Sequence, residues 1–200
     1  MSTPLIDDTE FKIYLRSELS AVTEIAERVA AVTAATSWLE QQCQRQWAIA
    51  SGSTTRVFDA PDCSPWLTIP DATTVTQVID FTTTLTVDVG YKLYPLNGIG
   101  PTGETLPYSK IARLTSGYFY NWYNYAKPGT ISVTATWGWA AIPSMIIEAC
   151  KIVAKDYVLN RDVAHGVIEI SSVGGVGSRE NRLVTAAIEK YGHPASIGIA

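Results

Sequence analysis

VTATWGWAAIPSMIIEACKIVAKDYV, residues 133–158, changes its pattern in the middle. Its first part is rich in Thr, Val and Trp, so we expect residues 129–139 to form the last strand of a sheet. Pro143 follows, where proline suits the first turn of a helix. Beyond it, apolar residues recur at helical spacing, at positions 145, 146, 149, 152, 153 and 157. The segment therefore predicts a strand that leads through a proline into a helix.

Upstream of this strand, short runs rich in Thr, Val, Ile and aromatic residues are separated by Asp, Pro, Gly or Ser. Such runs are typical of an antiparallel sheet with brief turns. They read TTRVFDA, WLTIP, TTVTQVIDF, TLTVDV and YKLYPL. The sequence therefore predicts a β insertion of approximately residues 53–139.

Helical patterns lie on both sides of this insertion. Asp7 and Glu10 have the spacing of a capping box before FKIYLRSEL. A longer helix is predicted from Ser20 to about Trp47, because its larger apolar residues recur every three, four or seven positions. The face they share consists of Val22, Ile25, Val29, Val32, Leu39, Cys43 and Trp47.

A short final helix is predicted from Arg182 to Tyr191, and a C-terminal arm of approximately residues 183–200 overlaps it. The predicted fold class is therefore α+β: a helical core of a long N-terminal helix, the helix after Pro143 and the short C-terminal helix, with an inserted antiparallel sheet. We expect a single domain over residues 1–200, because 200 residues with 46% hydrophobic content can bury one sizeable core.

Composition excludes several classes of protein. No apolar run reaches the roughly 18 residues that span a bilayer, and the N-terminus lacks a signal-peptide pattern, so we expect a soluble protein that is not secreted. Cys43, Cys63 and Cys150 are far apart, which predicts reduced thiols. Residues 105–147 contain three basic and no acidic residues, which is too few bases to favour nucleic-acid binding as the primary role.

One motif suggests a nucleotide site. Gly98-x-Gly100-x-x-Gly103 matches the fingerprint of dinucleotide-binding loops, which also needs a helix that begins within it and an acidic residue about 20 positions later. Pro107 would break that helix, and the next acidic residue after Glu104 is far downstream. We interpret the glycines as a turn and expect no cofactor.

Catalytic and metal-binding residues are not indicated. His165, His193 and Cys150 lack a third partner that the sequence could nominate. The pairs Asp7-Asp8 and Asp59-x-x-Asp62 have the commoner interpretation of helix starts and turns. The sequence therefore predicts a protein that is not an enzyme.

Residues 118–125, read as YFYNWYNY, are the most unusual segment. A hairpin tip packed over the sheet and a contact between subunits are the main interpretations, because Tyr and Trp are enriched at interface anchors. We take Tyr120, Trp122 and Tyr123 as candidate subunit-interface residues. A β-sheet module that binds carbohydrate or another surface through the aromatics Tyr118–Tyr125 is the alternative function.

Several short motifs occur in an order that resembles one known family. They are Cys43-Gln44-Arg45 at the end of a helix, a Thr-Arg-Val strand, and a Trp-Gly-Trp strand end that leads through a proline into a helix closing with Tyr157, Arg161 and Asp162. Over roughly residues 20–165 the chain resembles the head-to-tail adaptors, or head-completion connectors, of long-tailed bacteriophages. It departs from them at Gln44, where a glycine is common, and in its loops 118–125 and 166–178.

This resemblance implies a structural virion protein at the capsid–tail junction, made in the host cytoplasm. The implied partners are copies of itself in a closed ring, usually dodecameric, the portal protein, and a downstream tail-completion or stopper protein. DNA would pass through the lumen without sequence-specific binding, and no membrane is involved. Adaptors of this family are thought to grip the portal through the C-terminal region, so Tyr191, Ile197 and Ile199 become candidate portal-docking residues.

Overall fold

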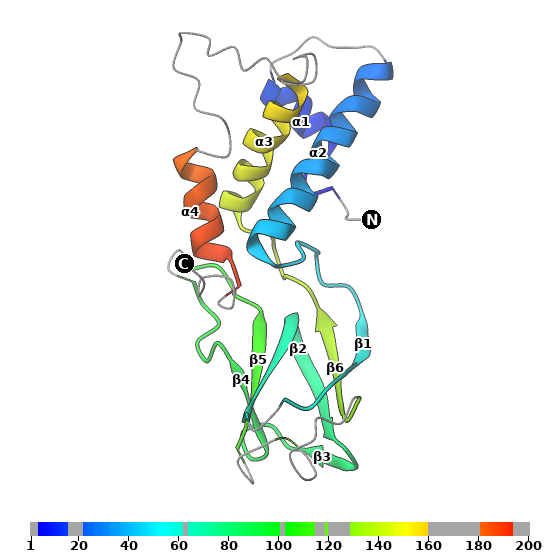
Figure 1. The fold of residues 1–200 in the computed structure, drawn as a ribbon, viewed down its shortest axis with the longest axis vertical. Helices are drawn as coiled ribbons and strands as arrows, with labels where there is room; N and C mark the ends of the chain where they lie inside the picture. The colour runs from blue at the N-terminus through cyan, green and yellow to red at the C-terminus, as the bar shows by residue number, and fades with distance from the viewer. Residues whose placement is uncertain are drawn as a thin grey trace. The chain divides into compact units, whose positions relative to one another are not determined.

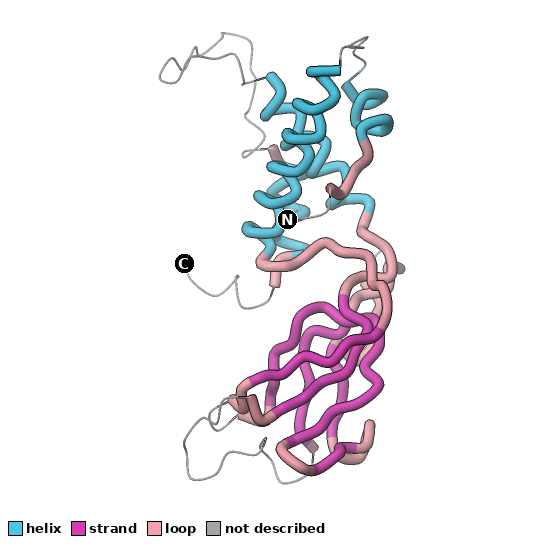
Figure 2. The backbone as a smooth tube through the Cα atoms, turned by 90° about the vertical axis from the view of Figure 1, so that its right-hand side faces the viewer, coloured by secondary structure: helices cyan, strands magenta, loops and turns pink. Residues whose placement is uncertain are grey.

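The chain divides into two compact units in a computed structural model that describes residues 4–15, 22–61, 64–100, 103–114, 119, 129–159 and 181–193. One unit comprises Met1–Trp47 with Ile142–Ala200, and the other Ala48–Ala141. The described helices belong to the first unit and the described strands to the second (Figures 1 and 2). The predicted α+β fold, with an antiparallel sheet inserted between helices, is confirmed.

The helical unit contains α1 (Asp8–Leu15), α2 (Val22–Cys43), α3 (Ser144–Leu159) and α4 (Arg182–Tyr191). α1 begins as the capping-box spacing predicts, because the Glu10 backbone N–H donates to Asp7 Oδ1 at 2.7 Å. α2 and α3 run in opposite directions and pack along their length (Figure 1). Thr36 Oγ1 on α2 lies 3.7 Å from Cys150 Sγ on α3, and both side chains are small and fully buried, as a close approach of two helices requires.

α2 ends at Cys43, and the next residue, Gln44, adopts the left-handed conformation with φ of 51°. The Arg45 N–H then donates to the Glu40 carbonyl at 3.1 Å, a bond that closes the last turn of the helix. A side chain with a Cβ is strained in this conformation, whereas glycine is not. This geometry explains why a glycine suits the position that Gln44 occupies.

The sheet unit contains six described strands in the order β1-β6-β2-β5-β4, with β3 paired to β2. They are β1 (Ser53–Phe58), β2 (Trp66–Asp80), β3 (Thr83–Leu85), β4 (Tyr91–Tyr94), β5 (Tyr108–Arg113) and β6 (Ile131–Trp137). β2 bends in its middle (Figure 1). Its first half pairs with β5 and its second half with β6, and the two pairings meet at Ala72.

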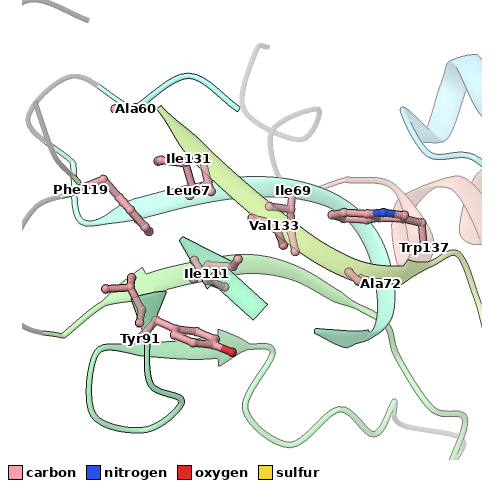
Figure 3. Packing of buried hydrophobic residues seen from close by; sticks show 13 residues of the cluster. Ala60, Leu67, Ile69, Ala72, Tyr91, Ile111, Phe119, Ile131, Val133 and Trp137 are labelled. Carbon is pink, nitrogen blue, oxygen red and sulfur yellow. The ribbon is translucent and has the colours of Figure 1, made fainter. Parts of the chain in front are cut away.

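The sheet encloses a hydrophobic core on its inner face (Figure 3). β6 shows why, because its burial alternates: Ile131, Val133 and Ala135 are buried, while the intervening Ser132 and Thr134 are not. The other core residues include Leu67, Ile69, Val78, Tyr91, Ile111 and Phe119.

Trp137-Gly138-Trp139 lies at the end of β6 and contacts the residues that precede β1. Trp137 Nε1 donates to the Thr54 carbonyl at 2.9 Å, and Trp139 Nε1 donates to Asp71 at 3.0 Å. Gly138 has φ of 115°, and a Cβ there would stand 2.5 Å from the Ala48 carbonyl oxygen. Only glycine permits this close backbone approach.

Three details of the sheet differ from the sequence-based expectation. WLTIP and TTVTQVIDF form one bent strand, β2, rather than two. YSKIAR forms β5, which the sequence pattern did not indicate, because small or polar residues such as Ser109 and Ala112 fill buried positions. Of TLTVDV, residues 84–89, only Thr84 and Leu85 lie in a strand, β3, after which the chain turns at Asp88, with φ of 60°.

The described residues of the Gly98–Gly103 segment, 98–100 and 103, belong to a turn, as predicted. Ile99 and Thr105 form an antiparallel bridge, and the Gly100 N–H donates to the Glu104 carbonyl at 2.7 Å. Gly98 and Gly103 both have positive φ. The glycines therefore shape the connection between β4 and β5.

Candidate interaction surfaces

Tyr191, predicted to dock on a portal, is buried within the helical unit. Its ring meets that of Trp47 edge to face, with centroids 6.4 Å apart and planes at 84°. The next residues are also held, because the Gly192 N–H donates to the Ile188 carbonyl at 2.7 Å and the His193 N–H to the Cys43 carbonyl at 2.8 Å. Tyr191 therefore anchors the end of α4 against the end of α2.

The other predicted docking residues, Ile197 and Ile199, lie outside the described residues. The same holds for Tyr120, Trp122 and Tyr123, the candidate subunit-interface residues. Phe119 is the one described member of that aromatic segment, and it is almost fully buried in the core of the sheet unit. At least one aromatic side chain of the segment thus serves the core.

The apolar stripe of α2 is only partly covered. Its second half is buried at Val32, Leu39 and Cys43, where the helix ends four residues earlier than predicted, and Trp47 is buried beyond that end. In its first half, Ile25 and Val29 are each 41% exposed. The sequence predicted this apolar face of the helix but did not indicate which part of it stays exposed.

Tyr157 on α3 lies at the same level as Val29. Thr36 Oγ1 and Cys150 Sγ are 3.7 Å apart, which fixes the register of the two helices. Val29 precedes Thr36 by seven residues and Tyr157 follows Cys150 by seven, about two helical turns in the same spatial direction. Tyr157 is 40% exposed. We call Ile25, Val29 and Tyr157 the open seam.

Ion pairs fix α1 on its neighbours. The buried Arg28 donates to both carboxylate oxygens of Asp8, at 2.6 and 2.9 Å, which lowers the pKa of Asp8. Lys151 contacts Glu10 and Glu148, each at 2.8 Å, and these hydrogen bonds raise the pKa of Lys151. α1 is thereby tied to both α2 and α3.

Two buried thiols lie in the helical unit. Burial raises the pKa of both Cys43 and Cys150 to about 11, so neither is a thiolate at neutral pH. Among the described residues, no group of His, Cys, Asp and Glu is arranged to hold a metal ion. Nor does any helix in the described ranges have the length and apolar character to cross a membrane. His165 lies outside the described residues.

The outer face of the sheet carries an aromatic pair that the sequence analysis did not single out. Trp66 is exposed, and its ring lies 4.8 Å from that of Tyr94 at an interplanar angle of 71°. Lys92 and Lys110 stand on the same face, since they alternate with the inward Leu93 and Ile111. Alternation within the runs WLTIP and YKLYPL was the signal that could have indicated this surface.

No protein-family model and no curated protein matches the sequence. Solved structures do match. The chain is similar to one in the neck of an empty GTA particle computed with C6 symmetry, with a TM-score of 0.55 and 20% identity over 96% of this chain and 93% of that one.

The neck of a native GTA particle computed with C12 symmetry matches with a TM-score of 0.50 and 17% identity, over 96% and 93% of the two chains. The virion of a native gene transfer agent (GTA) particle matches with a TM-score of 0.54 and 20% identity, over 94% and 89%. At these identities the likeness is one of fold, and it extends over nearly the whole of each chain. The protein therefore has a fold that occurs in the neck of gene transfer agent particles, which is consistent with the resemblance to head-to-tail adaptors.

Proposed function

We propose that this protein is a structural virion protein that forms a ring between the capsid portal and the tail. One observation carries the proposal: nearly the whole chain shares its fold with neck structures that were computed with C6 and C12 symmetry. The order of the short motifs from Cys43 to Tyr157 supports it independently. The role is mechanical, so it requires no catalysis.

In this proposal, both units act together as one adaptor domain in a closed ring, which we take to be a dodecamer. A closed ring requires each copy to present two different surfaces, one to each neighbour. The genome passes through the lumen, and a net charge of -4 per chain suits a channel that DNA crosses without adhering.

The open seam is one candidate for such a surface. Ile25 and Val29 continue the stripe that α2 buries further along, so a neighbouring copy can cover them with the same kind of packing. Tyr157 adds an aromatic anchor at the same level. Tyr120, Trp122 and Tyr123 remain candidate contacts with a neighbour.

The C-terminal arm, residues 183–200, is the proposed grip on the portal. Tyr191 packs on Trp47 and the His193 N–H donates to the Cys43 carbonyl at the end of α2, so the arm is held as far as His193. Beyond it, Ile197 and Ile199 would supply apolar contacts to the portal. Around a ring, a modest contact per subunit is multiplied through avidity. A downstream tail-completion or stopper protein would bind the opposite side of the ring.

Electron microscopy of the full-length protein mixed with its portal tests this function. We expect rings stacked coaxially on portal rings. A protein that stays monomeric, with portal rings left bare, would contradict the proposal.

Truncation after His193 tests the last residues of the arm, 194–200, alone, because it leaves Val184, Ala187 and Tyr191 in place. These α4 residues are buried, so a cut after Arg182 would disturb folding as well as docking. We expect the protein that ends at His193 to melt as the full-length protein does but to lose co-sedimentation with portal rings. Co-sedimentation at the full-length level would place the grip elsewhere.

A carbohydrate- or surface-binding module is the second candidate, and the pairing of the exposed Trp66 with the half-buried Tyr94 favours it. The segment Tyr118–Tyr125, which first suggested it, lies outside the described residues apart from Phe119. Mass distinguishes the two functions, because a binding module runs as a monomer or dimer. A glycan array with the variant Trp66→Ala as a control would detect such binding directly.

A further inference from the structure

Strand pairing places one set of side chains on the outer face of the sheet, where β2, β5 and β4 lie side by side (Figure 1). Leu67, Ile111 and Leu93 are paired across these strands, and they belong to the core or pack against it. The residues that alternate with them therefore point outward. We call this set the basic–aromatic face, and it consists of Trp66, Thr68, Lys92, Tyr94, Lys110 and Ala112.

The aromatic part of this face is held in place. Trp66 and Tyr94 belong to strands that lie on opposite sides of β5, yet their ring centroids are 4.8 Å apart. The β5 residue paired with Trp66 is Ala112, whose small side chain leaves room for the two rings to meet over the strand. Ala112 is accordingly only 6% exposed, whereas Trp66 is 42% exposed. The pair therefore presents fixed aromatic surface to solvent.

Two lysines flank the aromatic pair. The strand register places Lys92 in the same row as Trp66, and Lys110 in the same row as Tyr94. No member of the face is acidic. Asp88 borders it, with its Oδ1 4.0 Å from Lys92 Nζ, but both side chains are exposed, so this ion pair contributes little. The face is thus locally positive in a chain with a net charge of -4.

We propose that the basic–aromatic face binds DNA whose base faces are accessible, as in a single strand or at a duplex end. Lys92 and Lys110 contact two phosphates of the strand, and a base stacks on Trp66. Charge complementarity and the exposed ring together select this ligand. A neutral sugar would use only the aromatic pair, and an acidic peptide only the lysines. Stacking requires no particular base, so the contact has no sequence preference.

This inference goes beyond the proposed ring and rests on it for the source of the DNA, the genome that passes through the lumen. Two phosphate contacts and one stacked base form a weak contact in a single copy. A ring repeats the face in every subunit, which strengthens the contact through avidity. Inside a duplex the base faces are covered by their neighbours, so the contact concerns the end of the genome and leaves its length free to pass.

Fluorescence anisotropy of a labelled oligothymidine of about 12 nucleotides tests the contact, with the full-length protein at low salt. Trp66→Leu keeps an apolar side chain over Ala112 but removes the ring, and should weaken binding at least about fivefold. Trp66→Phe keeps a ring and should retain most of the affinity. Absent binding by the unmodified protein, or unchanged binding by Trp66→Leu, would overturn the proposal.

The salt dependence of binding tests the lysines. Each phosphate contact to a single strand contributes about 0.7 to the magnitude of the slope of log K against log salt. Lys92→Gln and Lys110→Gln should each reduce this magnitude by about 0.7. Lys155→Gln, at an exposed position of α3, is the matched control and should leave the slope unchanged. An equal reduction in the control would show general charge attraction and overturn the assignment to this face.

Two competitors define the ligand. A relaxed, covalently closed circular duplex offers phosphates without accessible base faces, so it should compete with the labelled strand far less, per nucleotide, than unlabelled oligothymidine does. Equal competition would reduce the contact to phosphate attraction and overturn the role of Trp66. A neutral oligosaccharide should not compete, and displacement of the strand by it would favour the carbohydrate-binding module instead.

Electron microscopy with the portal separates this inference from the proposed function. Rings on the portal without any binding of oligothymidine reject the DNA contact alone. A protein that binds oligothymidine through Trp66 but stays monomeric beside bare portal rings rejects the ring and supports the contact.

Discussion

The helical unit and the sheet unit are stabilised in different ways. In the helical unit, side chains join preformed helices: Arg28 binds Asp8 and Lys151 binds Glu10. In the sheet unit, backbone joins backbone across long sequence separations, as where the Trp139 N–H donates to the Ala48 carbonyl at 2.8 Å. Helices joined by side chains can shift when one contact is lost. Two backbone segments in direct contact have no such freedom. We therefore expect substitutions in the sheet unit to lower the free energy of unfolding more than substitutions in the helical unit.

The largest effect is expected at Gly138. Gly138→Ala combines a strained φ of 115° with a Cβ 2.5 Å from the Ala48 carbonyl, and should lower the free energy of unfolding by about 4 kcal/mol. Gly52→Ala is the matched control, since its φ is 63° but nothing lies within 4 Å of the added Cβ. It should cost about 1–2 kcal/mol. Chemical denaturation checks both variants. Equal decreases in the free energy of unfolding for Gly138→Ala and Gly52→Ala would show that the close approach to the Ala48 carbonyl is unimportant.

In the helical unit, Leu39→Ala should lower the free energy of unfolding by about 3 kcal/mol, because Leu39 is fully buried. Ile25→Ala, in the open seam, should cost about 1 kcal/mol or less in the monomer. Thermal melts of both variants check this difference. If Ile25→Ala lowered the free energy of unfolding as much as Leu39→Ala, the side chain of Ile25 would already be buried within one chain.

The Asp8–Arg28 pair should make the helical unit sensitive to acid. Because Arg28 lowers the folded-state pKa of Asp8, the pair stabilises fully above the ordinary carboxyl pKa of about 4, and this stabilisation is lost as the pH falls through the lowered pKa. Asp8→Asn should cost about 2 kcal/mol at pH 7 and weaken the acid dependence. Asp88→Asn, at an exposed pair 4.0 Å from Lys92, should change either quantity little. Denaturation at several pH values checks both.

The smallest effect is expected at Gln44, and it should be stabilising. Gln44→Gly relieves a φ of 51° at the end of α2 and should raise the free energy of unfolding by about 0.5 kcal/mol. Gln41→Gly, within the same helix, should instead cost about 1 kcal/mol. The melting temperature should rise for Gln44→Gly and fall for Gln41→Gly. A lower melting temperature for Gln44→Gly would contradict the assignment of backbone strain to Gln44.

Sequence patterns predicted those helices and strands that are determined by residues close together in the sequence. The helix start at Asp7, the helix after Pro143 and the alternating strand that ends at Trp137 all follow from neighbouring residues. β5 did not, because its buried Ser109 gains its place only from strands paired on either side. The candidate site shows the same limit, because the sequence does not indicate that the ring of Tyr191 contacts that of the distant Trp47.

The chain enters and leaves the sheet unit at one place. The Trp139 N–H donates to the Ala48 carbonyl and its carbonyl accepts from the Ala50 N–H at 2.9 Å, so the first residue of the unit is hydrogen-bonded to one that lies two residues before its last. A segment whose two ends lie side by side can be replaced by another segment without moving the flanking chain. A sheet of another size, or with longer loops, could replace residues 48–141 without altering the spacing of its two attachment points. Variation in the sheet unit can therefore accumulate while the helical unit keeps its own chain path.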